Sequence, residues 1–376
     1  MSQAFTALDH QHMAHALRLA ERGLYTTQPN PRVGCVIAHG DEVVGSGWHR
    51  RAGEPHAEVH ALREAGERVR GATAYVTLEP CAHHGRTPPC ADALVAAGVA
   101  RVVVAAEDPF PQVAGRGIAK LRAAGMTVDA GLLRDEAREL NVGFFSRLER
   151  GRPFVRLKLA MSLDGRTALA NGESKWITGE AARADGHRWR ARSSAILTGS
   201  GTVLADDPHL TVRLPVAEAF ATPLRVVLDR DLRVPAHFHV MDATAPTLCI
   251  HDAQRAPPTV APASVRHAGV LLDGNGRLDL NAVLALLARL EVNELHVEAG
   301  SRLGGALLVA GLVDELLLYV APVLLGDLAC PLLELPPLAS MAERWRLAVV
   351  EQRQVGVDWR LRLRPQPARP WAVSPD

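Results

Sequence analysis

The chain has 376 residues, of which 48% are hydrophobic and 22% are charged, and its formal net charge is +1. This length exceeds one ordinary domain, and the apolar fraction is enough for sizeable cores. The near-zero charge and the 4% aromatic content argue against a nucleic-acid partner. No apolar run approaches the ~18 residues that a membrane span requires, so no membrane partner is expected.

The first 150 residues alternate between helical and strand patterns. Apolar residues repeat at helical spacing over 9–23, and the runs 32–38 and 42–47 flank a His-Gly-Asp turn between two strands. The pattern continues with helices at 56–66, 90–98 and 117–125 and strands at 72–78 and 101–108. Strands that alternate with helices predict an α/β layer architecture with a partly parallel sheet.

A charged, turn-like stretch at 147–153 lacks periodicity, and a second α/β series follows it. We therefore expect a first domain over 1–149, a second over 150–365 and a mobile tail over 366–376. Stretches rich in Ala and Pro at 214–223 and 252–266 predict surface loops. The second series comprises FVRLKLAMSLDG, a helix near 179–192, AILTGSGTV, LRVVLD, NAVLALLARL, ELHVEAG, a helix over 302–311 and VDELLLYVAPVLLG.

The cysteine content is low and odd in number, with five residues spread over the whole chain. This usage argues against a disulfide framework and for a reducing compartment. The N-terminal segment is charged and interrupted, unlike a signal peptide. We expect a cytoplasmic protein whose cysteines are metal ligands or core residues.

The sharpest motif is Pro-His-Ala-Glu at 55–58, followed by Glu-Pro-Cys at 79–81 and by Cys90. A catalytic zinc ion needs three protein ligands and one position for water, and His56, Cys81 and Cys90 supply the three. The metal lowers the pKa of that water enough to generate hydroxide near neutral pH. Glu58, two residues after the first ligand, is placed to move protons from the water to the departing amine, as in the zinc deaminases.

Two other interpretations of this motif remain open. The common signature has two residues between its cysteines, whereas eight separate Cys81 from Cys90. A structural zinc site would require a fourth ligand, for which His83, His84 and Cys35 are the candidates. Alternatively, Cys81 and Cys90 are ordinary buried thiols. The order of His-x-Glu and Pro-Cys at predicted helix starts favours the catalytic site.

Longer motifs resemble one family, the bifunctional deaminase/reductase of riboflavin biosynthesis. In the first half these are PNPxVGCV from residue 29, AGEPHAEVHAL and TLEPCAHHGRTPPC, in which the long cysteine spacing is normal for the family. In the second half they are KLAMSLDGRTA, GESKWIT, ADDPxLTVR and VEAGSRLGGALL. The resemblance covers about residues 10–365. It implies a cytidine-deaminase-like three-layer domain followed by a dihydrofolate-reductase-like domain.

The resemblance also implies two consecutive reactions and two cofactors. The first domain, with one zinc ion per chain, would hydrolyse the 2-amino group of 2,5-diamino-6-ribosylamino-4(3H)-pyrimidinone 5′-phosphate. The second would use NADPH to reduce the ribosyl side chain to ribityl, giving 5-amino-6-ribitylaminouracil 5′-phosphate. A homo-oligomer, a dimer or larger, is expected.

Site residues follow from the matching motif positions. In the first domain, Asn30 matches a pyrimidine-contacting asparagine, and His49, His83 and Arg86 fall in segments that approach substrate and its phosphate. In the second domain, the resemblance assigns NADPH contacts to Ala160, Trp176, Thr202, Asp206, Gly300, Ser301, Arg302, Leu303, Gly304, Gly305 and Ala306. It assigns substrate contacts to Ser174, Arg190, Leu210, Arg213 and Glu298.

The residues themselves give weaker support to the reductase. Small residues at 299–306, which follow a strand and open a helix, suit phosphate binding, but they also suit close helix packing. No G-x-G-x-x-G motif follows a first strand, so a standard dinucleotide-binding fold is not supported. Arg190 and Arg213 suit a sugar phosphate or an ion pair, and Lys158 is a candidate for polarising the sugar carbonyl or imine.

Several of the other positions could instead have a purely structural role. Trp176 could stack on a ring or belong to the core, Asp206 could cap a helix, and Asn30 could be a turn residue. At the level of function, the alternative is a zinc deaminase of another base with an inactive or differently specific reductase-like domain. A non-catalytic zinc module is a third possibility, which an intact Glu58 disfavours.

Overall fold

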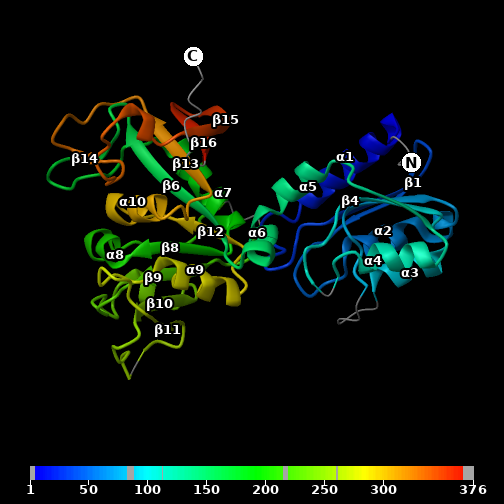
Figure 1. The fold of residues 1–376 in the computed structure, drawn as a ribbon, viewed down its shortest axis with the longest axis horizontal. Coiled ribbons are helices and arrows are strands. Elements are labelled where there is room, and N and C mark those ends of the chain that lie inside the picture. Colours follow the sequence, from blue (N-terminus) through cyan, green and yellow to red (C-terminus); the bar gives the residue numbers. More distant parts are fainter. Residues whose placement is uncertain (1–4, 83–88, 112, 215–218, 260, 367–376) are drawn as a thin grey trace, which may run out of the picture. The chain divides into compact units, whose positions relative to one another are not determined.

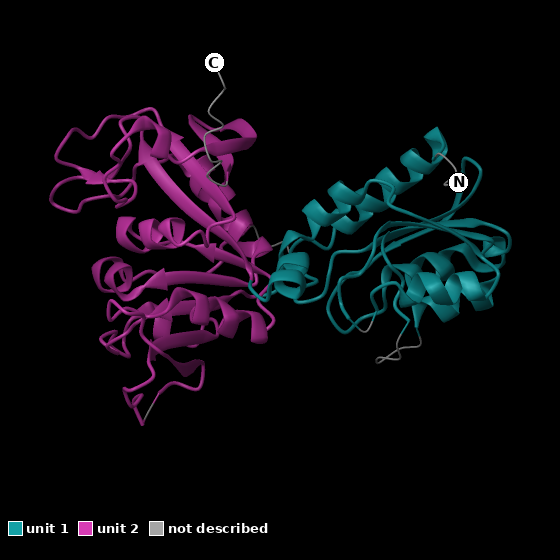
Figure 2. Cartoon of the chain, viewed as in Figure 1, with its two compact units in different colours: residues 1–152, 219–221 teal, residues 153–218, 222–376 magenta. Residues whose placement is uncertain are grey.

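The computed structural model describes residues 5–366 except 83–88, 112, 215–218 and 260. The chain divides into two compact units (Figure 2). Unit 1 comprises residues 1–152 and 219–221, and unit 2 comprises residues 153–218 and 222–376. Among the described residues, no helix is long and apolar enough to cross a membrane.

Unit 1 is a three-layer α/β/α domain (Figure 1). Its sheet has the order β2-β1-β3-β4-β5, in which β1 is antiparallel to β2 and β3, while β3, β4 and β5 run parallel. The strands are β1 (Gly34–His39), β2 (Glu42–Trp48), β3 (Thr73–Leu78), β4 (Arg101–Ala106) and β5 (Thr127–Ala130).

Alternation along these strands sends apolar side chains to both faces of the sheet, so each face carries a helical layer. One core lies under α2 (Ala57–Ala65), α3 (Cys90–Ala97) and α4 (Arg116–Ala123). The other lies under α1 (Ala7–Glu21), α5 (Arg134–Leu140) and α6 (Val142–Arg150). A short 3-10 helix spans Gly66–Val69.

Unit 2 is built on a nine-stranded sheet of order β11-β10-β9-β8-β12-β6-β13-β16-β15. Neighbours from β11 to β13 are parallel, and β16 and β15 complete the sheet as antiparallel strands. The strands are β6 (Phe154–Ser162), β8 (Ala195–Gly199), β9 (Leu224–Leu228), β10 (Thr247–Asp252), β11 (Val265–Val270), β12 (Glu294–Val297), β13 (Glu315–Ala321), β15 (Leu347–Val355) and β16 (Asp358–Pro365). A separate two-stranded pair is formed by β7 (Arg166–Ala168) and β14 (Cys330–Pro331).

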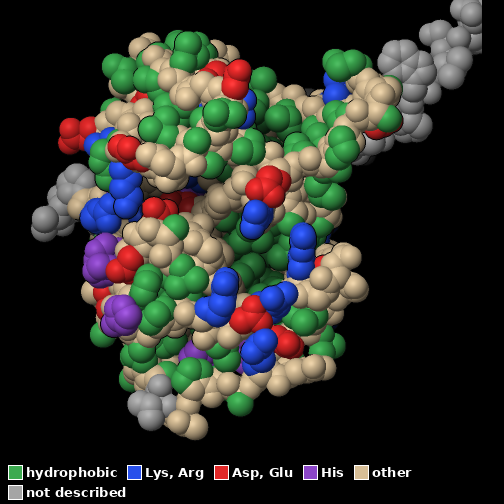
Figure 3. Space-filling view, turned by 90° about the vertical axis from the view of Figure 1, so that its left-hand side faces the viewer, with side chains coloured by type: hydrophobic (Ala, Val, Ile, Leu, Met, Phe, Trp, Pro, Cys, Tyr) green, Lys and Arg blue, Asp and Glu red, His purple; other side chains and the backbone are tan. Residues whose placement is uncertain are grey.

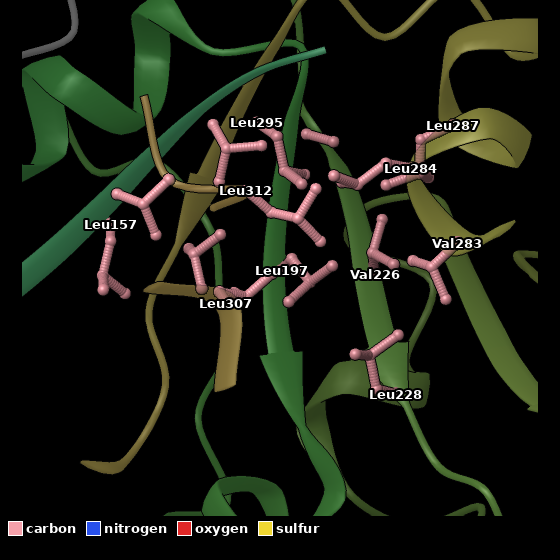
Figure 4. Packing of buried hydrophobic residues seen from close by; sticks show 14 of the residues in the cluster. Leu157, Leu197, Val226, Leu228, Val283, Leu284, Leu287, Leu295, Leu307 and Leu312 are labelled. Carbon is pink, nitrogen blue, oxygen red and sulfur yellow. The ribbon is translucent and has the colours of Figure 1, made fainter. Parts of the chain in front are cut away.

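The two faces of this sheet bury different helices. Leucine and valine side chains of β6, β8, β9 and β12 meet those of α9 (Leu280–Arg289) and α10 (Ser301–Val309) in one apolar layer (Figure 4). The opposite face packs against α7 (Glu180–Arg192) and α8 (Ser200–Asp206). Short 3-10 helices span His239–Met241 and Met341–Glu343.

The α/β class and both fold expectations are confirmed, but several elements differ from the sequence prediction. Residues 147–150, expected to be turn-like, form the last turn of α6, whose apolar face includes the buried Phe144 and Phe145. The strands β15 and β16 were not predicted, because their arginines interrupt the apolar pattern. In β16, Arg360 pairs with Glu351, and Arg362 and Arg364 pair with Glu315. The described residues between Asp252 and Val265 form the expected loop, while the ends of the range 252–266 belong to β10 and β11. The tail beyond 366 lies outside the described residues.

Candidate active sites

Three metal-ligating side chains of unit 1 meet where β3 ends and two helices begin. His56 is the N-cap of α2, Cys90 is the first residue of α3, and Cys81 lies just beyond β3. The His56 Nδ1 atom lies 3.7 Å from Cys81 Sγ and 3.3 Å from Cys90 Sγ, and all three ligand atoms fall within 4.8 Å of one another. Tetrahedral zinc separates a nitrogen from a sulfur ligand by about 3.6 Å, so these residues fit the ion.

Close contacts between backbones hold the ligand-bearing segments in place. A Cβ atom at Gly47 would lie 2.5 Å from the Ala57 carbonyl oxygen, and one at Gly45 would lie 2.3 Å from the Ala61 carbonyl oxygen. The glycines of β2 therefore let α2 approach the sheet more closely than any other residue would allow. This approach positions the start of α2, which carries His56 and Glu58.

Glu58 is only 3% exposed, in the first turn of α2, and burial raises its pKa. A carboxyl group with a raised pKa can both accept and return a proton near neutral pH. In the part of the chain that the structure describes, the metal cluster has three ligands, and the fully buried Cys35 is not among them. His83 and His84, the other candidates for a fourth ligand, lie outside the described residues, as does Arg86.

Asn30 and His49 form a connected pair beside this cluster. The Asn30 Nδ2 group lies 3.1 Å from His49 Nε2, and His49 Nδ1 lies 3.2 Å from the Pro55 carbonyl oxygen. An Nδ1 proton donated to Pro55 leaves Nε2 free to accept from Asn30. The His49 ring also packs edge-on against His56, with 5.4 Å between centroids. Asn30 is thus tied to the metal ligand through a buried histidine.

Sequence reasoning assigned no role to two acidic residues near the same ligands. The carboxylate of Glu79 accepts hydrogen bonds from the backbone N–H groups of Asp108, Gly115 and Ile118, and so ties the end of β3 to the start of α4. Burial, with Glu79 and Cys81 nearby, raises the pKa of Asp108 to about 6. The Glu-Pro-Cys order was visible in the sequence, but no local pattern pointed to Asp108.

Unit 2 contains a cavity of about 1280 Å³, larger than the usual ~300–1,000 Å³ of small-molecule pockets. Figure 3 views this unit from a side on which the surface is hollowed, with Lys and Arg side chains gathered around the hollow. Of the residues expected to bind NADPH, the cavity is lined by Thr202, Asp206, Gly300, Ser301, Arg302, Leu303, Gly305 and Ala306.

The remaining expected cofactor residues lie elsewhere. Ala160, Trp176 and Gly304 are not in the lining of this cavity. A Cβ atom at Gly304 would lie 2.9 Å from the Leu333 side chain, so this glycine permits close packing. Trp176 is 68% exposed and therefore not a core residue, and the Arg183 guanidinium lies 4.8 Å from its ring centroid.

A second group of expected residues surrounds Lys158 on β6. Glu298, just after β12, accepts hydrogen bonds from Arg190 Nε at 2.5 Å and Arg190 Nη2 at 2.8 Å. Burial raises the pKa of Glu298, but Arg190 and Lys158 outweigh that effect and hold the pKa well below its ordinary value. Burial lowers the pKa of Lys158, whose Nζ lies 5.8 Å from the Tyr319 ring centroid.

Two further expected positions and one unexpected histidine lie in the same unit. Leu210 is buried in a core cluster, and Ser174 lies in the irregular segment after β7. His187, which sequence reasoning missed, accepts a hydrogen bond at Nδ1 from the backbone N–H of Arg213. Burial and the cations Arg190 and Arg213 lower the pKa of His187 to about 4, so this ring is neutral at physiological pH.

Comparisons with known proteins find relatives of both units. Residues 6–106 match the family model of the cytidine and deoxycytidylate deaminase zinc-binding region, and residues 153–360 match that of the RibD C-terminal domain. The riboflavin biosynthesis protein RibD of Escherichia coli is 51% identical over 363 residues, which cover 93% of this chain and 97% of the relative. That of Haemophilus influenzae is 46% identical, covering 96% and 99%.

Solved structures give the same result. Acinetobacter baumannii RibD (form 1) superposes with a TM-score of 0.90 at 46% identity, covering 96% of this chain and 99% of that one. A Thermotoga maritima diaminohydroxyphosphoribosylaminopyrimidine deaminase/5-amino-6-(5-phosphoribosylamino)uracil reductase superposes with a TM-score of 0.85 at 32% identity and the same coverage. The chain therefore belongs to the RibD family of bifunctional deaminase/reductases of riboflavin biosynthesis.

Proposed function

We propose that unit 1 hydrolyses the 2-amino group of 2,5-diamino-6-ribosylamino-4(3H)-pyrimidinone 5′-phosphate and that unit 2 then reduces the ribosyl side chain to ribityl with NADPH. The observation that carries the first step is the convergence of His56, Cys81 and Cys90 beside the buried Glu58. The products would be ammonia and, after reduction, 5-amino-6-ribitylaminouracil 5′-phosphate.

In the deamination, Glu58 carries the proton. A zinc ion held by His56, Cys81 and Cys90 would supply the Lewis acidity that lowers the pKa of a water molecule toward neutral pH. Glu58 takes a proton from the attacking water and delivers it to the amino nitrogen, so that ammonia leaves and a carbonyl forms at C2. Asn30, oriented through its contact with His49, is placed to hydrogen-bond the pyrimidine edge.

In the reduction, the chain's own residues hold and polarise the sugar. NADPH supplies the hydride. We assign NADPH to the cavity beside residues 300–306 and the sugar to the group around Lys158. The Lys158 ammonium donates a hydrogen bond to the carbonyl or imine that accepts the hydride. Glu298, fixed by Arg190, orients the sugar hydroxyls, and Arg213 binds its phosphate.

A homo-oligomer is part of the proposal, with a second copy covering the edge of the unit 2 sheet. The outermost strand, β15, exposes Leu347 (37%), Val349 (65%) and Val350 (40%). Exposed apolar edge strands usually mark association surfaces. We expect Val349→Glu to shift the molecular mass measured by light scattering toward the monomer. Cytoplasmic location also remains a proposal, supported by five free cysteines.

Product mass spectrometry tests the proposed function directly. Purified, zinc-loaded protein is given the phosphoribosyl diaminopyrimidinone with and without NADPH. Deaminated ribosyl product without NADPH and ribityl product with it are the expected results. Deamination without any reduction would contradict the assignment of unit 2, and the absence of turnover would contradict the proposed substrate.

A further inference from the structure

The cavity of unit 2 is lined by four arginines, and two of them are already neutralised. Arg230 donates from Nε and Nη2 to Asp231 Oδ2, at 3.0 and 2.8 Å. Arg302, 89% exposed, pairs with Glu334 at 3.3 Å. A guanidinium that is held by a carboxylate has less charge to offer a ligand.

The other two, Arg233 and Arg277, have no such partner. Among the described residues, no carboxylate oxygen lies within 4.0 Å of either guanidinium, and Arg233 Nη2 makes a single long contact of 3.4 Å to Ser200 Oγ. Arg277 uses its backbone N–H, not its side chain, to bind Asp273 Oδ1. Arg233 and Arg277 help to lower the pKa of Asp231 and Asp273, which also line the cavity, but neither forms an ion pair within 4.0 Å with these carboxylates. The N–H groups of both guanidinium groups therefore remain available to an anion.

Arg230 ties together the two loops that carry these cations. Its Nη1 group donates to the Gly276 carbonyl oxygen at 2.7 Å, and Asp273 Oδ1 closes the turn by accepting from the N–H groups of Asn275 and Arg277. The loop after β9 and the loop before α9 thus form one continuous wall. This wall is separate in sequence from residues 300–303, 305 and 306 at the start of α10, which also line the cavity.

The two walls suit two different phosphates. Small residues and backbone N–H groups at the start of α10 suit a pyrophosphate. Unpaired guanidinium groups on the other wall suit an additional dianionic phosphate, which each can bind through two parallel hydrogen bonds. NADPH carries such a phosphate at the 2′ position of its adenosine, where NADH has only a hydroxyl group.

We propose that Arg233 and Arg277 bind the adenosine 2′-phosphate and make this chain selective for NADPH over NADH. This inference rests on the proposed use of a nicotinamide cofactor in the cavity. It assigns selectivity to the unpaired cations and gives Arg230 a positioning role. Arg302, at the start of α10, is placed beside the part shared by both cofactors.

The test measures binding, not turnover, by isothermal titration calorimetry on the zinc-loaded full chain. NADP⁺ and NAD⁺ are titrated into wild type, Arg233→Gln, Arg277→Gln and the double variant. Loss of one charged hydrogen-bonding partner should raise the Kd for NADP⁺ by about 10-fold or more. The Kd for NAD⁺ should change less than 2-fold, which also shows that the variants are folded.

Two controls and a smaller probe sharpen the result. Arg255→Gln removes the same charge from a residue that pairs with Asp231 but does not line the cavity, and it should leave the preference for NADP⁺ unchanged. Arg302→Gln should weaken both nucleotides alike. Adenosine 2′,5′-bisphosphate should bind wild type more tightly than 5′-AMP, and the double variant should lose this difference.

Four results would overturn the inference. Equal weakening of NADP⁺ and NAD⁺ in the Arg233 and Arg277 variants would place these cations on a shared phosphate. If only Arg302→Gln loses the preference for NADP⁺ over NAD⁺, the selectivity belongs to α10. Wild type that binds NADP⁺ and NAD⁺ equally would remove the selectivity itself. Wild type that binds neither nucleotide would overturn the proposed reductase function, and this inference with it.

Discussion

Arg190 of α7 and Glu298, just after β12, form a two-hydrogen-bond ion pair with separations of 2.5 and 2.8 Å. The same guanidinium donates from Nη1 to the Thr211 carbonyl oxygen at 2.8 Å. Arg190 therefore orients a carboxylate beside Lys158 and supports the segment that leads to Arg213. Among the described residues, the Arg213 guanidinium has no ion-pair partner, so it is the cation with free capacity for a phosphate.

Because Arg190 is held in an ion pair and Arg213 is not, substitutions of these two arginines should have different effects on the kinetics of reduction. Arg190→Gln should lower kcat for the reduction by about 100-fold, because a misplaced Glu298 no longer orients the sugar. Arg213→Gln should instead raise KM by about 10-fold or more, through the loss of a charged contact to phosphate. Steady-state kinetics on deaminated substrate separates the two effects. The opposite pattern of kcat and KM defects would contradict the roles assigned to Arg190 and Arg213.

Glu58→Gln should abolish deamination while leaving one zinc ion per chain. General acid–base catalysis contributes about 10²–10⁴-fold, and the amide cannot carry the proton. Ammonia release and zinc content by atomic spectroscopy are the two measurements. Glu54→Gln is the matched control, because this residue is exposed and precedes the metal ligand. Retained turnover in Glu58→Gln would remove Glu58 from the mechanism.

His56→Ala should separate the two activities. Removing the only imidazole ligand of the three-residue cluster should eliminate zinc binding and deamination. Reduction of substrate that has already been deaminated should continue at the wild-type rate, because none of the residues proposed for reduction belongs to unit 1. Loss of both activities in a folded protein would indicate that the sites are coupled.

Gly117→Ala should loosen the metal site without changing any ligand. A Cβ atom at this position would lie 2.0 Å from the Pro80 carbonyl oxygen, so the segment that carries Cys81 must move. Loss of support for a metal ligand typically weakens metal affinity by about 10–100-fold. Competition with a zinc chelator measures the change. Gly186→Ala, in helix α7 with open space around it, should leave zinc affinity unaltered.

Glu315 should make unit 2 sensitive to acid. Its carboxylate is fully buried and lies 2.8 Å from both Arg156 and Arg362. Burial raises the pKa of Glu315, but the two arginines outweigh that effect and hold the pKa at about 2, compared with an ordinary value of 4.5. Because the folded pKa is the lower one, the stabilisation is complete above pH 4.5 and is lost as pH falls toward 2. The shift corresponds to about 3 kcal/mol.

Glu315→Gln should therefore lower the free energy of unfolding at pH 7 by about 3 kcal/mol. Urea denaturation at pH 7 and at pH 3 measures the effect, and the difference from wild type should shrink at the lower pH. The Glu351 side chain belongs to the same network but is 30% exposed, so Glu351→Gln should lower the free energy of unfolding by less. An equal loss at both pH values would show that the carboxylate charge is not the cause.

The sequence by itself determined the α/β class, the order of most elements and the zinc ligands. Zinc ligands are recognisable because the metal requires a small set of residue types. His56, Cys81 and Cys90 also lie close together in the sequence, in the segment that runs from the start of α2 through β3 to the start of α3. Apolar periodicity is likewise a local property, which is why strands such as β4 and helices such as α2 can be recognised from the order of their residues alone.

Only the tertiary structure decided the contacts between residues distant in sequence. The hydrogen bonds of Glu79, the raised pKa of Asp108, the pairing of Arg190 with Glu298 and the cavity arginines all depend on which strands are neighbours. The strands β15 and β16 were hidden for the same reason. A buried arginine has the same local sequence as an exposed one, and it becomes acceptable inside the fold only when a distant carboxylate is packed against it.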